Sequence, residues 1–262
     1  MRFYNWILRD EDDGIGSQPP VRLFVMGENR WRDEATWPLA RAVDTPYYFH
    51  SAGRAAGLDG DGTLSPEAPQ DEAHDTFFFN PADPSPSRGG HSCCEESVTP
   101  MGPYDQRPVE RRMDVLCYTS EPLAAPLEVT GPVSVTLWAA TNAVDTDWVA
   151  RLVDVHPDGR AINLTEGIIR ASYRNGVERR ELLERDAVME YRIDLRATSN
   201  VFLPDHRLRV DVASSSFPLW DRNPNTGMAA ADARLQDLVP ATQAIFHDVS
   251  RPSHVTLPIV RS

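Results

Sequence analysis

The chain has 262 residues, of which 41% are hydrophobic, and it carries 39 acidic residues against 26 basic ones, for a formal net charge of −13. This hydrophobic share is enough for a packed core, which excludes wholesale disorder. The acidic balance argues against nucleic acid and an anionic membrane surface as partners, and no apolar run approaches the roughly 18 residues of a membrane span.

The N-terminal segment predicts a short helix followed by a connector. Phe3, Trp6 and Ile7 fall near helical spacing, and an acidic run then leads to Gly14. A helix of this length is marginal alone and needs a surface to pack on. Residues 14–20 are typical of a linker. The segment has neither the long apolar stretch nor the cleavage site of a signal peptide, so we expect a cytoplasmic protein.

Strand patterns begin after this connector. Residues 21–26 are a continuous apolar strand candidate, and residues 46–50 and 76–80 are short aromatic ones. A glycine-rich turn at 57–65 lies between the two aromatic segments, which predicts a hairpin. Residues 81–110 are rich in proline, glycine and serine and lack periodicity, so we expect a long surface loop there.

The second half of the chain is mostly strand. Val133, Val135 and Leu137 alternate with polar residues, and residues 148–155 are apolar on both parities, as in a strand buried on two faces. A single helix is expected in this half, at 229–238. The remaining strand candidates are 161–169, 189–195, 208–212, 243–246 and 254–260. This pattern predicts an all-β fold, an antiparallel β-sandwich of the jelly-roll type, and it has too few helices for a doubly wound α/β domain.

Side chains that could catalyse a reaction lack the usual context for it. The chain has no G-x-S-x-G nucleophile elbow, and residues 214–216 (Ser-Ser-Ser) end an alternating strand, where we expect ordinary strand-end hydrogen bonds. Asp145 and Asp147 are two apart and therefore share one face of a strand. Paired carboxylates can do acid–base work, but we interpret these two as solvated acids at a strand start.

Two motifs suggest metal ligands but fit a metal site poorly. His91, Cys93 and Cys94 lack the spacing of a zinc finger or ribbon, and three cysteines, two of them adjacent, make a poor disulfide framework. Residues 59–63 resemble the opening of an EF-hand calcium loop without the glycine and glutamate that the pattern requires further on. We predict a glycine-rich turn there, leave a carbonyl-ligated calcium open, and predict no cofactor.

Two polar segments are candidates for binding. Residues 30–34 could bind a ligand through Trp31, but we favour a Trp-anchored turn held by local Arg–carboxylate pairs. Residues 217–227 form a proline-bounded loop directly after a patterned strand, and such loops dock partners or carry function more often than strands do. The alternative is that its Asp and Asn side chains satisfy the backbone of the turn. The residues alone do not separate the two interpretations.

Several of these segments resemble one family of enzymes. The stretch 198–207 (TSNVFLPDHR), followed by 214–218 and 221–227, looks like the C-terminal domain of the cocaine-esterase, α-amino-acid ester hydrolase and X-Pro dipeptidyl-peptidase family. Further matches lie at 25–27 with 31–34, 144–147, 153–155 with 157–161, and 252–254. The resemblance departs at Asp205, where glycine is expected; if this position needs a positive φ, Asp is tolerated at some cost.

The resemblance implies a modular serine hydrolase. In the family, an α/β-hydrolase domain with a helical cap carries Ser, Asp and His, and a C-terminal jelly roll similar to galactose-binding folds packs against it. Residues 21–262 would be that jelly roll, and residues 1–20 the last hydrolase helix and its connector. The triad lies upstream in the family, so no catalytic residue is transferred, and we expect a fragment or truncated gene product that is inactive alone.

We therefore expect a non-catalytic domain that buttresses a hydrolase domain and walls part of its substrate entrance, in an enzyme that cleaves esters or amides through an acyl-serine. The apolar face of the N-terminal helix would contact that domain or a second copy of the chain. The residues expected in a docking or ligand surface are Arg32, Asp33, Glu34, Asn200, Trp220, Asp221, Arg222, Asn223 and Asn225. The alternative is a free-standing carbohydrate- or ligand-binding sandwich with Trp138, which alternates outward from the core, as its platform.

Overall fold

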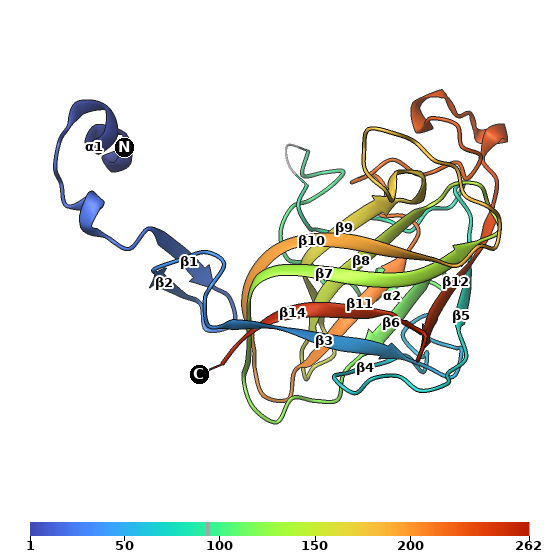
Figure 1. Ribbon diagram of the computed structural model, residues 1–262, viewed down its shortest axis with the longest axis horizontal. Coiled ribbons are helices and arrows are strands. Elements are labelled where there is room, and N and C mark those ends of the chain that lie inside the picture. The colour runs from blue at the N-terminus through green and yellow to red at the C-terminus, as the bar shows by residue number, and fades with distance from the viewer. Residues whose placement is uncertain (93–94, 262) are drawn as a thin grey trace.

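The structure, a computed structural model, describes residues 1–92 and 95–261. An N-terminal arm stands away from a β-sandwich body (Figure 1). The arm consists of helix α1 (Arg2–Arg9), a 3-10 turn (Ile15–Ser17) and an antiparallel ribbon made of β1 (Val21–Val25) and β2 (Arg30–Glu34). Within the described residues, every helix is too short or too polar to cross a membrane.

The front layer of the sandwich is organised around one long strand. β7 (Leu127–Thr141) pairs with β10 (Met189–Phe202) along one edge. Along its other edge it pairs with β14 (His254–Val260) and then with β12 (Ala241–Asp248). The outer strands of this layer are β3 (Ala42–His50) on β14, and β5 (Asp75–Phe79) and β13 (Arg251–Pro252) on β12.

The back layer is a second antiparallel sheet, behind β7 and β10 in Figure 1. Its strands, in spatial order, are β9 (Ala161–Arg170), β8 (Asp147–Val155), β11 (Arg207–Ala213) and β6 (Val115–Thr119). The short strand β4 (Thr63–Ser65) pairs with β3 and makes one parallel pairing with β6. The two layers are therefore joined along this edge.

The core lies between the two layers and follows the alternation of the strands. β7 contributes Val133, Val135 and Leu137, and β8 contributes Trp148 and Leu152, to one buried cluster. Burying one such side chain stabilises the folded state by about 1.5–3 kcal/mol. The predicted all-β sandwich, preceded by a short helix, is confirmed. The prediction that the strand near 148–155 is buried on both faces is also confirmed, since every residue of β8 is buried.

The outer face of the back layer is covered by irregular chain. Parts of residues 81–110 lie across it: the Gln106 N–H donates to the Ala161 carbonyl at 2.7 Å, and helix α2 (Arg107–Glu110) buries Val109. The prediction of a surface loop is therefore wrong for these parts. Backbone that packs through single hydrogen bonds instead of a ladder leaves no periodicity in the sequence.

Charged side chains fill the space beneath this cover. Arg151 lies 3.2 Å from Glu166 and 3.5 Å from Asp211, and Arg209 donates to Glu110 at 2.8 Å. Burial and the charge of Asp211 raise the pKa of Glu110 to about 8. Removing one partner of a buried ion pair typically costs about 3–5 kcal/mol, because an uncompensated charge remains. These charges therefore tie the cover to the sheet.

Three local predictions are wrong. Residues 46–50 and 76–80 do not form a hairpin, because β3 pairs with β14 and β5 with β12, which lie far along the chain. Residues 30–34 form strand β2 and not a turn, because a charge pair across the ribbon supports an exposed strand there. The predicted helix at 229–238 is two separate 3-10 turns (Ala230–Asp232 and Leu235–Asp237).

The turn between β10 and β11 explains the departure from the family pattern at Asp205. Its φ is 65°, in the left-handed region that glycine enters freely and that Asp tolerates. The turn closes with a hydrogen bond from the His206 N–H to the Leu203 carbonyl at 3.2 Å. The position therefore needs a positive φ, as the expected glycine indicates.

A fully buried carboxylate joins β5 to the strands around it. Asp75 accepts hydrogen bonds from Tyr118, Ser51, His247 and the backbone N–H of Ala55, at 2.8–2.9 Å. Burial works to raise the pKa of Asp75, but these hydrogen bonds outweigh it and hold the pKa below its usual value. The ionised carboxylate is thus the form that the fold selects.

We expect Asp75→Asn to lower the free energy of unfolding by about 3 kcal/mol at neutral pH, because the shared acceptor loses its charge. Since the pKa of Asp75 is lower in the folded protein than its value of about 4 in the unfolded chain, its contribution is fully present above about pH 4 and is lost as the pH falls through the folded pKa. Urea unfolding at several pH values measures this. The gap between wild type and variant should shrink in acid.

Asp71→Asn, at an exposed site, is the control and should leave stability unchanged at neutral pH. A gap for Asp75→Asn that stays constant down to about pH 2 would contradict the electrostatic explanation.

Candidate docking surface

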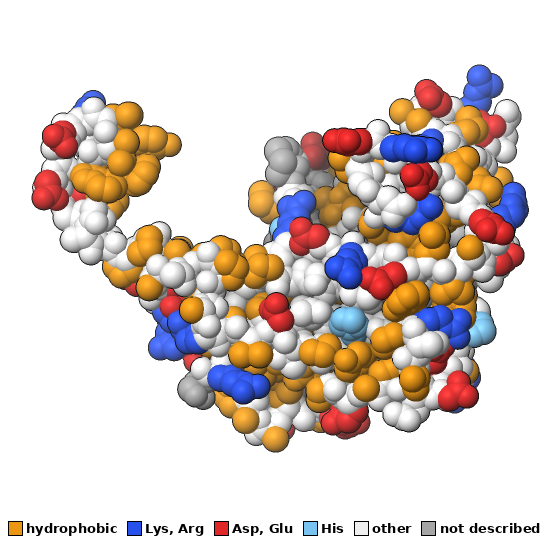
Figure 2. Space-filling view, viewed as in Figure 1, with side chains coloured by type: hydrophobic (Ala, Val, Ile, Leu, Met, Phe, Trp, Pro, Cys, Tyr) orange, Lys and Arg blue, Asp and Glu red, His pale blue; other side chains and the backbone are white. Residues whose placement is uncertain are grey.

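Helix α1 exposes its apolar side chains. None of its residues is buried, and Tyr4 and Leu8 are 62% and 74% exposed. Figure 2 shows hydrophobic side chains gathered at the tip of the arm, on the side that faces the body in this view. Trp6 alone packs locally, against the connector, where a Cβ on Gly16 would lie 2.7 Å from its ring. The helix therefore offers an apolar face that nothing in the described chain covers.

The ribbon continues this apolar surface. Phe24 and Trp31 are cross-strand partners in the register of β1 and β2, and their rings meet edge to face at 5.5 Å. Both stay exposed, Trp31 at 67%. On the same face of the ribbon, Arg22 and Asp33 form an ion pair of 2.6 Å. Phe24 is not among the docking residues predicted from the sequence, although the opposite charges at positions 22 and 33 are a signal for this register.

A cluster of ion pairs fixes β2 to the body. Arg32 lies between Glu34, at 2.6 Å, and Glu128 of β7, at 2.8 Å, and Arg41 donates to Glu34 at 2.7 Å. The hydrogen bond from Arg41, aided by the charge of Arg32, lowers the pKa of Glu34. Burial works to raise the pKa of Glu128, but hydrogen bonds from Arg32 and Thr130 keep it below its usual value. Arg32 and Glu34 therefore anchor the arm.

The ribbon is also joined to β10 through its backbone. The Met26 N–H donates to the Ser199 carbonyl at 3.0 Å, and the Val201 N–H donates to the Met26 carbonyl at 2.9 Å. Gly27 has a φ of 81°, and a Cβ there would lie 2.1 Å from the Val201 carbonyl oxygen. Asn200 is buried at this junction. Only glycine permits this approach, so position 27 sets where the arm leaves the body.

The loop predicted for docking is only partly exposed. Asn223 and Asn225 are buried: Asn223 donates to Asp147 at 2.9 Å and accepts from the Asn225 N–H at 2.9 Å, and Asn225 donates to the Val239 carbonyl at 2.7 Å. These contacts agree with the alternative interpretation of this loop, in which its Asn side chains form hydrogen bonds within the turn and to neighbouring segments.

Three other residues of the loop reach the surface. Asp221 is exposed, whereas Trp220 is partly exposed. Arg222 is also partly exposed and lies over the Phe217 ring at 5.5 Å. This loop can therefore present only a small mixed surface to a partner.

The predicted docking residues form two separate groups. Arg32, Glu34 and Asn200 lie at the start of β7, where Asn200 is opposite Val129. The loop 220–225 lies at the other end, held by Asp147 just beyond Thr141. From Val129 to Thr141, β7 spans about 40 Å at roughly 3.3 Å per residue. One contact surface of ordinary size does not include both groups.

The acidic pair at the start of β8 is structural, and the prediction of solvated acids is wrong. Asp145 and Asp147 are buried, and they pair with Arg180 at 2.9 Å and Arg170 at 2.8 Å. Burial raises the pKa of Asp147 above its usual value. Each carboxylate is committed to an arginine, so neither is free for acid–base work.

The serine cluster makes the strand-end contacts that were expected. The hydroxyl of Ser214 accepts a hydrogen bond from Gln243 at 2.9 Å, and that of Ser215 accepts one from the Ser85 N–H at 2.8 Å. The third hydroxyl of the cluster lies 3.4 Å from a nitrogen of Arg151.

Ser51, His247 and Glu72 form a chain that resembles a hydrolytic triad. The Ser51 hydroxyl lies 3.2 Å from His247 Nε2, and His247 Nδ1 lies 3.3 Å from Glu72. However, the Ser51 hydroxyl donates to Asp75 at 2.8 Å and accepts from the Gly53 N–H at 2.9 Å, and His247 is fully buried. The serine proton therefore points to a carboxylate and not to the imidazole, which suits a structural network and not a nucleophile.

Two hollows on the body could hold a ligand. One, of about 560 Å³, lies on the outer face of the front layer and is lined by Trp138, Glu190, Arg192 and His254. Trp138 is partly exposed in it, as a platform would be. This is the place in the described chain where a sugar-binding site of the predicted kind would lie.

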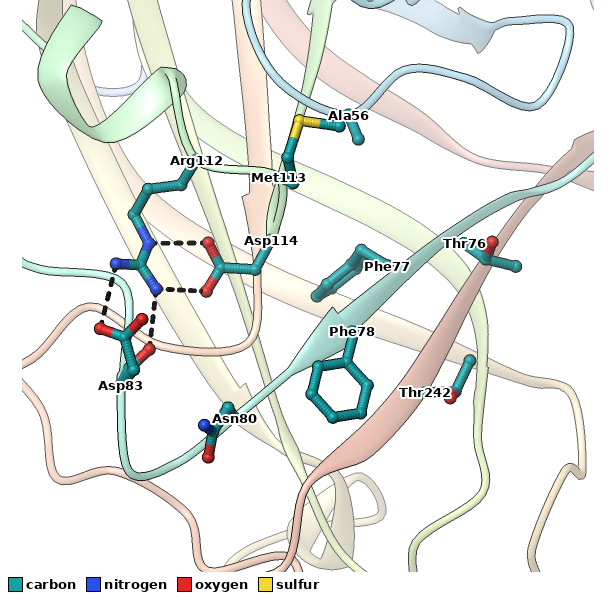
Figure 3. A pocket seen from close by; sticks show the side chains of 10 residues that line it. All are labelled: Ala56, Thr76, Phe77, Phe78, Asn80, Asp83, Arg112, Met113, Asp114 and Thr242. Carbon is teal, nitrogen blue, oxygen red and sulfur yellow. Dashed lines mark hydrogen bonds and ion pairs between the residues drawn. The ribbon is translucent and has the colours of Figure 1, made fainter.

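The second hollow has a volume of about 720 Å³ and lies beside β5 (Figure 3). Arg112, its one cationic side chain, is engaged by Asp114 at 2.7 Å and by Asp83 at 3.3 Å. Phe78 and Met113 are exposed on its rim. Since two carboxylates hold the one guanidinium, no cationic side chain among the described residues that line this hollow is free to bind an anionic ligand.

The glycine-rich segment 59–63 is a tight turn. A Cβ on Gly60 or Gly62 would lie within 2.6 Å of the backbone of Ala55 or Cys117. Asp61 pairs with Arg54 at 3.1 Å. Close backbone packing thus accounts for these glycines. Cys93 and Cys94 lie outside the described residues.

The chain matches one protein family over most of its length. The family described as the X-Pro dipeptidyl-peptidase C-terminal non-catalytic domain covers residues 13–256. The chain is 47% identical over 259 residues to the cocaine esterase of Rhodococcus sp. (strain MB1 Bresler), an alignment that includes 99% of this chain and 45% of the esterase.

Two solved structures have the same fold. An aminopeptidase from a marine sediment Thaumarchaeota archaeon superposes with a TM-score of 0.85 at 32% identity, over 99% of this chain and 43% of the other. An α-amino acid ester hydrolase superposes with a TM-score of 0.84 at 30% identity, over 98% of this chain and 43% of the other. The chain thus spans less than half the length of the relatives that it matches.

We expect Gly27→Ala to detach the ribbon from β10, because the new Cβ collides with the Val201 carbonyl. Amide hydrogen exchange at Met26 and Val201 should accelerate by about 10-fold or more, which corresponds to a loss of about 1.4 kcal/mol. Gly14→Ala is the matched control: its φ of 79° is nearly the same, but nothing lies within 4 Å of its Cβ. If Gly27→Ala accelerates exchange at Met26 and Val201 no more than Gly14→Ala does, the close approach is not what requires glycine at position 27.

Proposed function

Because the chain belongs to the family of X-Pro dipeptidyl-peptidase C-terminal non-catalytic domains, we propose that it is the β-sandwich part of a serine hydrolase and docks onto an α/β-hydrolase domain through its arm. The whole enzyme would cleave esters or amides through an acyl-serine, with a histidine base and an oxyanion hole. The sandwich would support the catalytic domain and wall part of the substrate entrance. The names of the relatives, an esterase and an ester hydrolase among them, support this.

The uncovered apolar surface of the arm is the observation that carries the proposal. Phe3, Tyr4, Ile7 and Leu8 of α1, together with Trp31 of the ribbon, are each more than half exposed. Burying one such side chain contributes about 1.5–3 kcal/mol. An eight-residue helix is marginal alone, so α1 needs a surface to pack on. A hydrolase domain that precedes the sandwich in the same protein meets both requirements.

We propose the same division of the chain that its sequence suggests. Residues 1–20 would fold with the hydrolase domain, and residues 21–262 would form the sandwich. The strand order, in which β7 lies beside β10, β12 and β14, supports a jelly-roll topology similar to galactose-binding folds. We place the joined enzyme in the cytoplasm.

The docking surface would be centred on the arm and its anchor. Asp33 is exposed on the ribbon, while Arg32 and Glu34 act by holding β2 in place. The exposed part of the far loop, at Trp220, Asp221 and Arg222, would contact a second region of the hydrolase domain. The apolar face of α1 could instead pair two copies of the chain.

The second candidate function is ligand binding by the sandwich itself. The hollow beside Trp138 combines an aromatic surface with Glu190, Arg192 and His254, which suits a sugar or another hydroxylated ligand. In titrations of the chain alone, sugar binding that Trp138→Ala abolishes would favour this function. Sedimentation of the chain alone separates the pairing of two copies from both other proposals.

The docking proposal is tested with a chimera in which this chain replaces the matching 45% of the Rhodococcus cocaine esterase. The chimera should hydrolyse an ester and react with a fluorophosphonate, and the chain alone should do neither. Ile7→Asp should lower the thermal stability and the activity of the chimera, because it buries an unpaired charge at the interface. Val249→Asp, at a 67% exposed residue in the turn between β12 and β13, is the matched control and should change neither.

A chimera that folds but is unaffected by Ile7→Asp would exclude α1 from the interface. Fluorophosphonate labelling of the chain alone would contradict its non-catalytic role.

A further inference from the structure

We infer that Asp154, His156 and His206 form a binding site for a divalent transition-metal ion of the zinc type. One ligand atom from each of the three residues lies within 4.8 Å of the other two. Two imidazoles and one carboxylate are a donor set that zinc takes in sites that keep a water molecule as fourth ligand. The sequence around these three residues has neither the cysteine spacing of a zinc site nor the pattern of a calcium loop. It therefore predicts no metal there.

The pairing of two strands brings the three side chains together. Arg207 of β11 lies opposite Val155 of β8. Continued by one residue, the same antiparallel register sets His206 opposite His156. Asp154 precedes His156 by two residues and therefore shares its face of β8. Opposite residues of such a pair have Cβ atoms about 4.5–5.5 Å apart, a separation that one ion can bridge.

Two tight turns fix the backbone at both histidines. Two hydrogen bonds close the β8–β9 turn: the His156 N–H donates to the Arg160 carbonyl at 2.8 Å, and the Gly159 N–H donates to the His156 carbonyl at 2.9 Å. In the β10–β11 turn, the His206 N–H donates a hydrogen bond to the Leu203 carbonyl at 3.2 Å. Both imidazoles thus stand on short, hydrogen-bonded turns beside a sheet. Little conformational freedom is lost when they take up an ion.

The side chains already face one another. His206 Nδ1 lies 2.7 Å from an oxygen of Asp154, and the ring centroids of His156 and His206 are 4.4 Å apart. Asp154 and His206 are buried, whereas His156 is partly exposed and leaves a side open to solvent. An ion bound by both atoms of the His206–Asp154 pair would take the place of the proton between them, which passes to solvent.

The charges next to the cluster do not oppose a cation. Arg160 is paired with Asp158 at 2.7 Å, and both are exposed. Arg207 directs a guanidinium nitrogen to the Ser120 carbonyl at 3.0 Å. The cation would join the β8–β9 turn to the β10–β11 turn at one end of the back layer. Its role is a cross-strand clamp, independent of the docking proposed for the arm.

The test is binding of Zn²⁺ and Co²⁺ to the full chain without an affinity tag. We expect one equivalent of Zn²⁺ to bind by calorimetry, a rise in Tm in its presence, and visible d–d absorption from Co²⁺. His156→Ala should weaken binding by about 10-fold or more and leave the His206–Asp154 contact in place. His74→Ala, at an exposed histidine that stacks on Phe246, is the control and should bind as the wild type does.

A second variant keeps the result interpretable. His156→Cys supplies a different zinc ligand at the same position, so it should restore binding and add a thiolate-to-Co²⁺ charge-transfer band. The proposal is overturned if the wild type binds no Zn²⁺ at millimolar concentration, or if His156→Ala binds as tightly as the wild type. A thiolate band in the wild-type spectrum would also overturn it, because the ion would then lie on cysteine.

Discussion

β7 is hydrogen-bonded along both of its edges, to β10 on one side and to β14 and β12 in succession on the other. Two prolines, which cannot donate to a ladder, are tolerated at this centre because the ladders shift register close to them. Pro132 faces Ala197, where β10 breaks its register after Asp194, and Pro258 lies in the irregular part of β14. A Cβ on Gly131 would come within 2.9 Å of Pro258, so the strand needs glycine here. The arm is attached beside these irregularities.

The back layer of the sandwich is covered by other parts of the chain, whereas the arm is not. On the back layer, irregular chain and buried ion pairs such as Arg209 with Glu110 cover the sheet completely enough to bury every residue of β8. On the arm, aromatic side chains such as Trp31 are held in a defined position by ion pairs and remain uncovered. This contrast between a covered sheet and an uncovered helix is the reason why we propose that another domain packs on the arm.

The sequence predicts those elements of the fold that show a periodic pattern of apolar residues. The inward-facing Val133, Val135 and Leu137, the doubly buried strand that follows, and the short first helix are all evident from periodicity. Pairing between strands that are distant in sequence leaves no periodic pattern. The predicted hairpin of β3 and β5 is wrong for this reason, and the predicted docking residues lie in two separate groups for the same reason. Polar residues were the hardest to interpret: Asn223 and Asp147 have the composition of a surface and the burial of a core, because each is satisfied by the other.

The connector between α1 and the ribbon is short, and this bears on how strongly the sandwich and the proposed hydrolase domain would have to attract one another. Residues 10–20, which link Arg9 to Val21, reach at most about 40 Å when fully extended. If α1 is part of the hydrolase domain, the sandwich is tethered to it at an effective concentration in the millimolar range. An interface with a dissociation constant of about 10 µM would then be occupied about 99% of the time. The apolar area on the arm can therefore stay small, and the domains can still separate and rejoin while the chain remains intact.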